Sequence, residues 1–191
     1  MQLIFLTLPS RAMSKVCLHD KQFKPHILEA SIDAAICRVA QMINSDYEGK
    51  NPLFLGVLNG SFLFVADLLR KINLECEISF VKLTSYEGTA TTGQVKELVG
   101  LKEDIRGREV IILEDIVDTG LTLKSLYNSL EGKGASSIKV ATLLFKPNAY
   151  IMDYPIDYVA LDVGNEFLVG YGLDYDGLGR NLKDIHIITE D

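Results

Sequence analysis

The chain has 191 residues, of which 48% are hydrophobic and 24% charged, and it carries a formal net charge of −7 at pH 7. This balance predicts one folded domain and argues against nucleic-acid binding through a broad basic surface, although a local anion site stays possible. The three cysteines are widely spaced and form no CxxC pair, which argues against a disulfide framework or a zinc site.

The first residues carry a short apolar run, Leu3 to Leu8, that no basic segment precedes. The run is too short for a secretion signal or a membrane span. We therefore expect residues 1–12 to be an extension outside the fold, residues 13–191 to form a single domain, and the protein to be cytoplasmic, without membrane contact.

The first half of the chain alternates helix and strand. Residues 26–47 are predicted to form a helix, because apolar side chains recur there at three- and four-residue steps. Residues 53–58, LFLGVL, are continuously apolar and predict a strand buried on both faces. After a break at residues 59–61, residues 62–72 predict a second helix.

The second half continues the alternation. Strands are predicted at 75–84, 107–114, 138–145 and 158–162, a helix at 119–130, and loops at 85–96 and 146–155. Such a pattern indicates a mainly parallel sheet flanked by helices, in which ligands bind beyond the carboxyl ends of the strands. The irregular tail, residues 163–191, is expected to form a small lobe over that rim.

The stretch from Val110 to Leu123, VIILEDIVDTGLTL, places three carboxylates where a buried strand should end. Charges buried without partners are costly, so a positive or hydroxylated ligand is expected there. The threonines and the glycine that follow, at the start of a helix, suit a phosphate, because free N–H groups point out of a helix N-terminus. Phosphate and hydroxyls together indicate a sugar phosphate.

This stretch closely resembles the phosphoribosyl pyrophosphate signature of the purine phosphoribosyltransferases, and the chain resembles their hypoxanthine or hypoxanthine–guanine branch of bacterial type. Other motifs of that family follow in the family's order: LNGSF at 58–62, SYEGTATTG at 85–93, LLFKP at 143–147, and EFLVGYGLDYDGLGRNL at 166–182. The resemblance implies the type I phosphoribosyltransferase fold, α/β with a mainly parallel sheet. It also implies a small hood built from both ends of the chain, formed largely by residues 163–191.

The resemblance also implies roles around the sugar phosphate. Glu114 and Asp115 resemble the pair that holds the ribose hydroxyls, partly through Mg²⁺, with Asp174 as a further Mg²⁺ ligand. Asp118 resembles the general acid/base that faces purine N7. The 5′-phosphate would lie in the loop formed by Asp118, Thr119, Gly120, Leu121 and Thr122.

At the purine, Lys146 resembles the donor to the 6-oxo group, Phe167 the stacking aromatic, and Leu168 the residue whose backbone reads the purine edge. The pyrophosphate would meet Asn59, Gly60 and Arg180, and Ser85 and Tyr86 would begin a closing lid. Many relatives carry a basic residue where this chain has Asn59, so Arg180 or a backbone amide is expected to replace that contact. The Leu58–Asn59 bond is expected to be a cis peptide.

The implied function is purine salvage. The 5-phosphoribosyl group passes from phosphoribosyl pyrophosphate to N9 of hypoxanthine, giving IMP and pyrophosphate, with guanine left open as a second acceptor. Mg²⁺ is the implied cofactor, a homodimer or homotetramer the implied assembly, and no nucleic acid is expected as a partner.

Other interpretations stay open from the residues alone. Glu114 and Asp115 could be ordinary acids at a strand end, Lys146 a solvated lysine and Phe167 a core residue. At the level of function, the main alternative is a regulator that binds phosphoribosyl pyrophosphate or a nucleotide without turnover. A phosphohydrolase and a P-loop NTPase are disfavoured, because neither DxDx[TV] nor GxxxxGK[ST] occurs.

Overall fold

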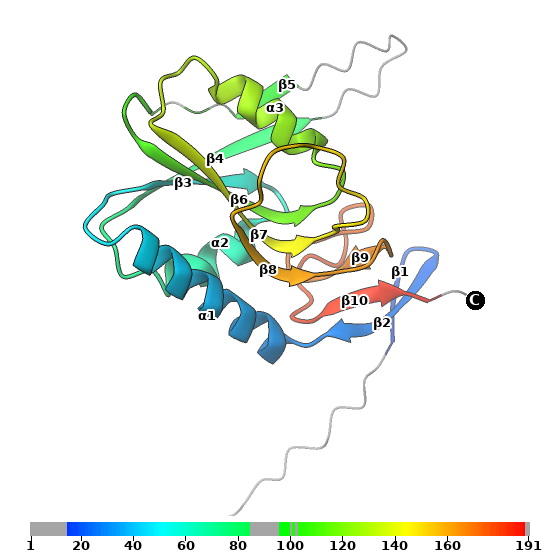
Figure 1. Cartoon of the computed structure of the whole chain (residues 1–191). Coiled ribbons are helices and arrows are strands. Elements are labelled where there is room, and N and C mark those ends of the chain that lie inside the picture. The colour runs from blue at the N-terminus through cyan, green and yellow to red at the C-terminus, as the bar shows by residue number, and fades with distance from the viewer. Residues whose placement is uncertain (1–14, 85–95, 100, 102, 190–191) are drawn as a thin grey trace, which may run out of the picture.

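The main sheet of the computed structural model has six strands in the order β5-β4-β3-β6-β7-β8, and only β5 runs antiparallel to its neighbour (Figure 1). The structure describes residues 15–84, 96–99, 101 and 103–189, so the predictions for residues 1–12, Ser85 and Tyr86 concern residues outside the described part of the chain. The strand bounds are β3 (Leu53–Leu58), β4 (Glu77–Thr84), β5 (Lys96–Val99), β6 (Glu109–Val117), β7 (Ser137–Phe145) and β8 (Tyr158–Asp162).

Helices cover both faces of this sheet. Helices α1 (Glu29–Asp46) and α2 (Phe62–Leu69) lie on one face, and α3 (Leu121–Leu130) lies on the other (Figure 1). The apolar stripe of α1 is fully buried, and the α3 stripe of Leu123, Leu126 and Leu130 packs on the central strands. Each such side chain contributes about 1.5–3 kcal/mol on burial, so these two cores fix the sheet that carries the rim.

A second, four-stranded antiparallel sheet forms the hood, in the order β1-β2-β10-β9. It combines β1 (Val16–Leu18) and β2 (Lys21–Ile27) from the start of the chain with β9 (Leu168–Val169) and β10 (Ile185–Ile188) from its end. The hood sheet lies beside the carboxyl ends of the main strands (Figure 1). The two ends of the chain are thus joined in one unit over the rim.

Several predicted boundaries are wrong by a few residues. The helix predicted from residue 26 begins at Glu29, because β2 occupies residues up to Ile27, and Pro25 within it favours extended backbone. The strand predicted to end at residue 114 continues to Val117, since the ladder to β7 pairs Ile116 with Leu144 and Val117 with Phe145. Glu114 and Asp115 therefore lie inside β6, and α3 begins at Leu121, two residues later than predicted.

The helix predicted over 62–72 ends at Leu69. Within the described parts of the chain, no helix combines the length and the apolar character needed to cross a membrane.

Candidate active site

A pocket of about 640 Å³ lies at the carboxyl end of the central strands. The loop after β3, the end of β6 and the first turns of α3 form its walls, as parallel strands with crossover helices require. Five residues singled out from the sequence line it: Gly60, Glu114 and Asp115, with Leu121 and Thr122 on α3. The predicted rim is therefore a real concavity with carboxylates in its wall.

Glu114 and Asp115, the acidic pair in this wall, both have raised pKa values. Glu114 is 4% exposed, and burial, helped by the neighbouring charge of Asp115, raises the pKa of Glu114 well above its ordinary value. Burial also raises the pKa of Asp115 to about 6, although backbone hydrogen bonds and the charge of Arg180 pull it down. Such a pair favours a ligand that brings hydroxyl donors or positive charge.

The loop after β3 passes directly against Asp115. A Cβ atom added to Gly60 would lie 1.6 Å from Asp115 Oδ2, so only glycine allows this approach. The Leu58–Asn59 peptide bond is cis, which confirms the expectation for this junction. In the part of the chain that the structure describes, the N–H groups of Asn59 and Gly60 donate to no other group.

The loop between β6 and α3 presents further free amides. Gly120 has a φ of +86° and precedes the first residue of α3. Among the described residues, the backbone N–H groups of Thr119, Gly120 and Thr122 donate to no protein acceptor. Amides at a helix N-terminus bind anions, so this loop can accept a phosphate group.

The loop between β6 and α3 packs against the segment that follows β7. The Ile151 N–H donates to the Thr119 carbonyl at 3.3 Å, and side chains of Tyr150 and Met152 fill the space where a Cβ of residue 120 would lie. The loop predicted at 146–155 therefore supports the conformation of the loop between β6 and α3.

Lys146 and Asp118 form an ion pair, with Nζ donating to Oδ2 at 2.8 Å. Lys146 is only 8% exposed, whereas the Asp118 side chain is 46% exposed. Twenty-eight positions apart in the chain, the two residues meet because β6 and β7 are neighbours. The pair offers one strong donor and one acceptor about a hydrogen-bond length apart.

The hood contributes the remaining predicted residues. Arg180 Nη2 donates to Asp174 Oδ1 at 2.7 Å, and both charges lie close enough to Asp115 to shift its pKa. Leu168 is buried in β9, whereas the Phe167 ring beside it is 46% exposed. The interpretation of Phe167 as a core residue is therefore wrong, because an exposed ring is available to contact a ligand. Within the described residues, no group of three candidate ligands comes together as a preformed metal cage.

Sequence reasoning missed two sets of residues. Lys124, Ser125 and Asn128 line the same pocket, and their spacing from Leu121 places them on one face of α3, a signal that the sequence does contain. Tyr175 is only partly buried and packs edge-on against Phe167 at a centroid distance of 5.8 Å. No periodicity marks Tyr175, because the surrounding segment is irregular.

Among known protein families, the phosphoribosyl transferase domain family matches residues 27–176 of this chain. A hypoxanthine-guanine phosphoribosyltransferase of Streptococcus agalactiae is 47% identical over 150 residues, which cover 78% of this chain and 83% of the relative. The enzyme of the same name from Streptococcus pneumoniae is 40% identical over 161 residues, covering 84% and 89%.

Solved structures agree with this assignment. The crystal structure of a hypoxanthine-guanine phosphoribosyltransferase from Bacillus anthracis matches with a TM-score of 0.81 and 37% identity, covering 87% of this chain and 96% of that one. The hypoxanthine phosphoribosyl transferase of Trypanosoma cruzi matches with a TM-score of 0.82 and 35% identity, covering 91% and 95%. The matching family, the close relatives and the shared fold together establish that this chain belongs to the phosphoribosyltransferase family.

Proposed function

We propose that the protein is a hypoxanthine phosphoribosyltransferase of purine salvage, which accepts hypoxanthine and, as a second acceptor, guanine. N9 of the purine attacks C1 of phosphoribosyl pyrophosphate, the bond from C1 to the pyrophosphate oxygen breaks, and IMP or GMP forms. The observation that carries this proposal is the Lys146–Asp118 pair, 2.8 Å apart at the end of two neighbouring strands. The names of the relatives support the same reaction.

The proposed orientation of the sugar phosphate follows from the chemistry of the groups around the pocket. The 5′-phosphate is placed on the free N–H groups of the loop from Asp118 to Thr122, and the ribose hydroxyls on Glu114 and Asp115. The pyrophosphate then lies toward the free amides of Asn59 and Gly60 and the guanidinium of Arg180. The negative pocket wall also stabilises the positive charge that develops on the ribose ring.

Mg²⁺ fits the donor set of this site. Glu114 and Asp115 are hard oxygen ligands held at raised pKa by burial, and a divalent cation relieves that cost. Mg²⁺ commonly takes one or two carboxylates and completes its shell with water and substrate oxygens, so a preformed cage is not required. Asp174 is the candidate for a further ligand, once its ion pair with Arg180 is loosened. Bound Mg²⁺ would neutralise charge on the leaving pyrophosphate.

The purine is proposed to meet the ion pair along its O6–N7 edge. The Lys146 ammonium donates to O6, and Asp118 takes the proton from N7 as N9 attacks. O6 and N7 are neighbours on the ring system, as the two charged groups are in the site. The exposed ring of Phe167 supplies the stacking surface, and the Leu168 backbone reads the purine edge.

Lys146 should select 6-oxopurines over adenine. A lysine ammonium has donors and no acceptor, so the 6-amino group of adenine finds no partner there, while hypoxanthine and guanine do. We expect kcat/KM for adenine to be lower by about 10⁴-fold, the ratio typical when buried polar groups are left unpaired. Initial rates with hypoxanthine, guanine, xanthine and adenine measure this preference. Comparable rates for adenine and hypoxanthine would remove Lys146 from purine selection.

The competing interpretation, a regulator without turnover, makes a different prediction for the same protein. Such a regulator would bind phosphoribosyl pyrophosphate or IMP, yet would release no pyrophosphate when hypoxanthine is added. Calorimetric binding measured beside an assay of pyrophosphate release distinguishes the two. Binding accompanied by steady release supports the enzyme, and binding without release supports the regulator.

The proposed assembly is a homodimer or homotetramer. Phe62 of α2 and Ile78 of β4 are each 40% exposed, and both lie on the α2 side of the sheet. Exposed apolar residues on one face favour contact with another protein surface, here a second copy. Light scattering after gel filtration should give a mass of two or four chains, reduced in an Ile78→Glu variant and unchanged in Glu131→Gln. A monomer at micromolar concentration would refute this proposal.

A further inference from the structure

Three aromatic rings from distant parts of the hood form one cluster, which we call the hood aromatic cluster: Phe23, Phe167 and Tyr175. The Phe167 ring lies 5.8 Å from Tyr175 in an edge-on arrangement and 6.4 Å from Phe23, and Phe23 lies 6.0 Å from Tyr175. Phe23 is fully buried and Phe167 is half exposed, so the cluster carries one free face. The edge-on pair of Phe167 and Tyr175 contributes beyond its buried area and favours one relative orientation of the two rings.

Tyr175 is the member of the cluster whose position is fixed by polar contacts. Its hydroxyl donates to Asp20 Oδ1 at 2.7 Å, and its ring meets the His19 ring edge-on at 5.8 Å. His19 Nε2 in turn lies 3.2 Å from the carbonyl oxygen of Asp176. The turn between β1 and β2 therefore holds residues 175 and 176 from the opposite end of the chain.

We propose that Tyr175, anchored by Asp20 on the turn between β1 and β2, is a positioning residue that holds Phe167 against the purine. This inference rests on the proposed function, because it takes the exposed ring of Phe167 as the purine platform. A ring held from one side loses little freedom when a purine stacks on its other side, so the anchoring favours purine affinity. Neither Tyr175 nor Asp20 touches the reacting atoms in this account.

The effect should be confined to the purine. Asp174, which precedes Tyr175, is held by contacts of its own, since its Oδ2 accepts from the Gly177 N–H at 2.7 Å and its Oδ1 from Arg180 at 2.7 Å. The phosphate-binding loop and the acidic pair belong to β6 and α3, outside the hood. Loosening Tyr175 should therefore change KM for hypoxanthine without changing KM for phosphoribosyl pyrophosphate.

Four variants test the link. Tyr175→Phe keeps the ring and removes the hydroxyl, and Asp20→Ala removes the acceptor. Each should raise KM for hypoxanthine about three- to tenfold, the range for one net hydrogen bond, with kcat and KM for phosphoribosyl pyrophosphate within about twofold of the wild type. Asp20→Asn keeps an acceptor oxygen and should behave as the wild type. The double variant Tyr175→Phe/Asp20→Ala should be no worse than either single one, as two partners in one contact require.

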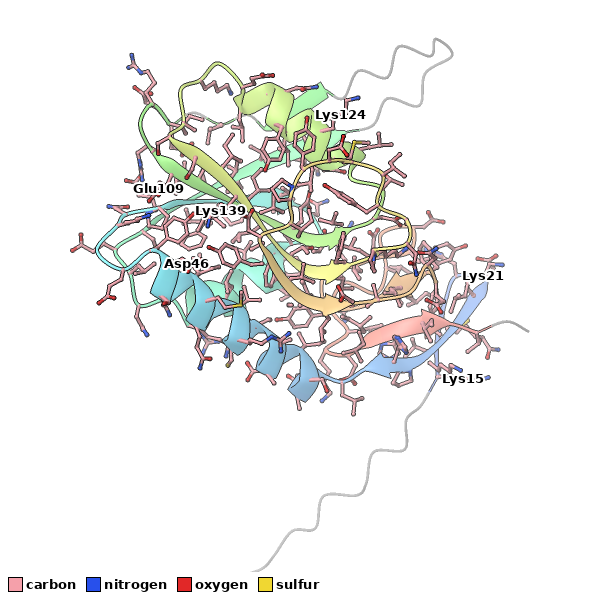
Figure 2. All side chains as sticks on the ribbon, in the orientation of Figure 1. Lys15, Lys21, Asp46, Glu109, Lys124 and Lys139 are labelled. Atoms are coloured by element: carbon pink, nitrogen blue, oxygen red, sulfur yellow. The ribbon has the colours of Figure 1, made fainter. Side chains whose placement is uncertain are left out.

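Tyr47→Phe is the matched control. Tyr47 is buried, and its hydroxyl has no hydrogen-bond partner among the described residues. The ammonium of Lys139 lies 5.8 Å from the Tyr47 ring centroid. Figure 2 shows Lys139 on the same side of the molecule as Asp46 and Glu109, whereas Lys21, which belongs to the hood, lies on the opposite side. The control should leave both KM values unchanged, because it makes the same chemical change far from the purine platform.

The outcomes separate the two claims. A wild-type protein that forms no nucleotide from hypoxanthine would overturn the proposed function and this inference with it. An active wild type whose Tyr175→Phe variant keeps its KM for hypoxanthine would overturn the inference alone. Equal rises in KM for both substrates, or additive effects in the double variant, would also overturn it, because they would indicate general damage instead of a link to Phe167.

Discussion

Replacement of Asp118 by Asn is expected to lower kcat by about 10²–10⁴-fold, the usual contribution of a general acid/base, while KM for phosphoribosyl pyrophosphate stays close to that of the wild type. Asn cannot take the purine N7 proton. Its amide oxygen can still accept the hydrogen bond that Lys146 gives to Asp118 at 2.8 Å, so the buried ammonium keeps a partner and the fold should be preserved. Steady-state rates of IMP formation measure the loss.

Asp153→Asn is the matched control for this substitution. Asp153 is an exposed carboxylate in the segment after β7 and has no part in the proposed chemistry. Its variant should turn over as the wild type does. Unchanged turnover in Asp118→Asn would remove Asp118 from proton transfer. A large rise in KM for phosphoribosyl pyrophosphate would instead assign it to substrate binding.

Replacement of Asp115 by Asn is expected to separate activity from stability. Activity should fall by about 10²–10³-fold, because the ribose and Mg²⁺ lose a charged ligand beside the reacting centre. The unliganded protein, in contrast, should become more stable at pH 8. Burial raises the pKa of Asp115 to about 6, whereas an unfolded chain leaves an aspartate near its ordinary value of about 3.9.

The sign of the pH dependence follows from these two values. The folded state binds the Asp115 proton more tightly than the unfolded state does. The associated stability is therefore fully present below about pH 4 and is lost as pH rises through about 6. At pH 8 the ionised carboxylate costs on the order of 3 kcal/mol, which the neutral amide avoids. For a chain of this length the variant should melt roughly 6–12 °C higher at pH 8, with little difference near pH 4.

Thermal unfolding of the two proteins across pH 4 to 8, without substrate or Mg²⁺, provides the measurement. Asp162→Asn, at an exposed carboxylate on the end of β8, is the control and should not change the melting temperature at pH 8. If Asp115→Asn melts at a lower temperature than the wild type at pH 8, the ionised Asp115 carboxylate is stabilised in the unliganded protein, which contradicts the burial argument.

The sequence predicted best those elements whose signal is local. The strand at 53–58 and the strand at 158–162 have the predicted bounds, since each is a short apolar run between polar or proline-containing breaks. The predicted end of β6 was wrong because a carboxylate usually indicates that a buried strand has ended. Only the ladder to β7, which pairs Glu114 with Thr142 and Ile116 with Leu144, shows that the strand continues past both acids.

Features that depend on tertiary pairing could not be read from periodicity. The hood joins β2 to β10. The seven residues of β2, KQFKPHI, are mostly polar and include Pro25, and β10 has only four residues, so neither strand gives a clear pattern of its own. The four-residue strand β5 was not predicted, and its first residue, Lys96, was assigned to the preceding loop. The strand forms because it pairs with β4. The family resemblance assigned Lys146 and Asp118 to one purine, but their direct contact was not predicted, since no local rule links a strand end to an acid 28 positions earlier.

The most direct test of the account is product formation from hypoxanthine and phosphoribosyl pyrophosphate with Mg²⁺, measured for the wild type beside Asp118→Asn. Chromatographic separation of IMP from hypoxanthine, together with assay of the released pyrophosphate, gives both products of one reaction. We predict IMP and pyrophosphate in equal amounts from the wild type, and IMP formation at least about a hundredfold slower in the variant. Binding of phosphoribosyl pyrophosphate by the wild type without any IMP would contradict it.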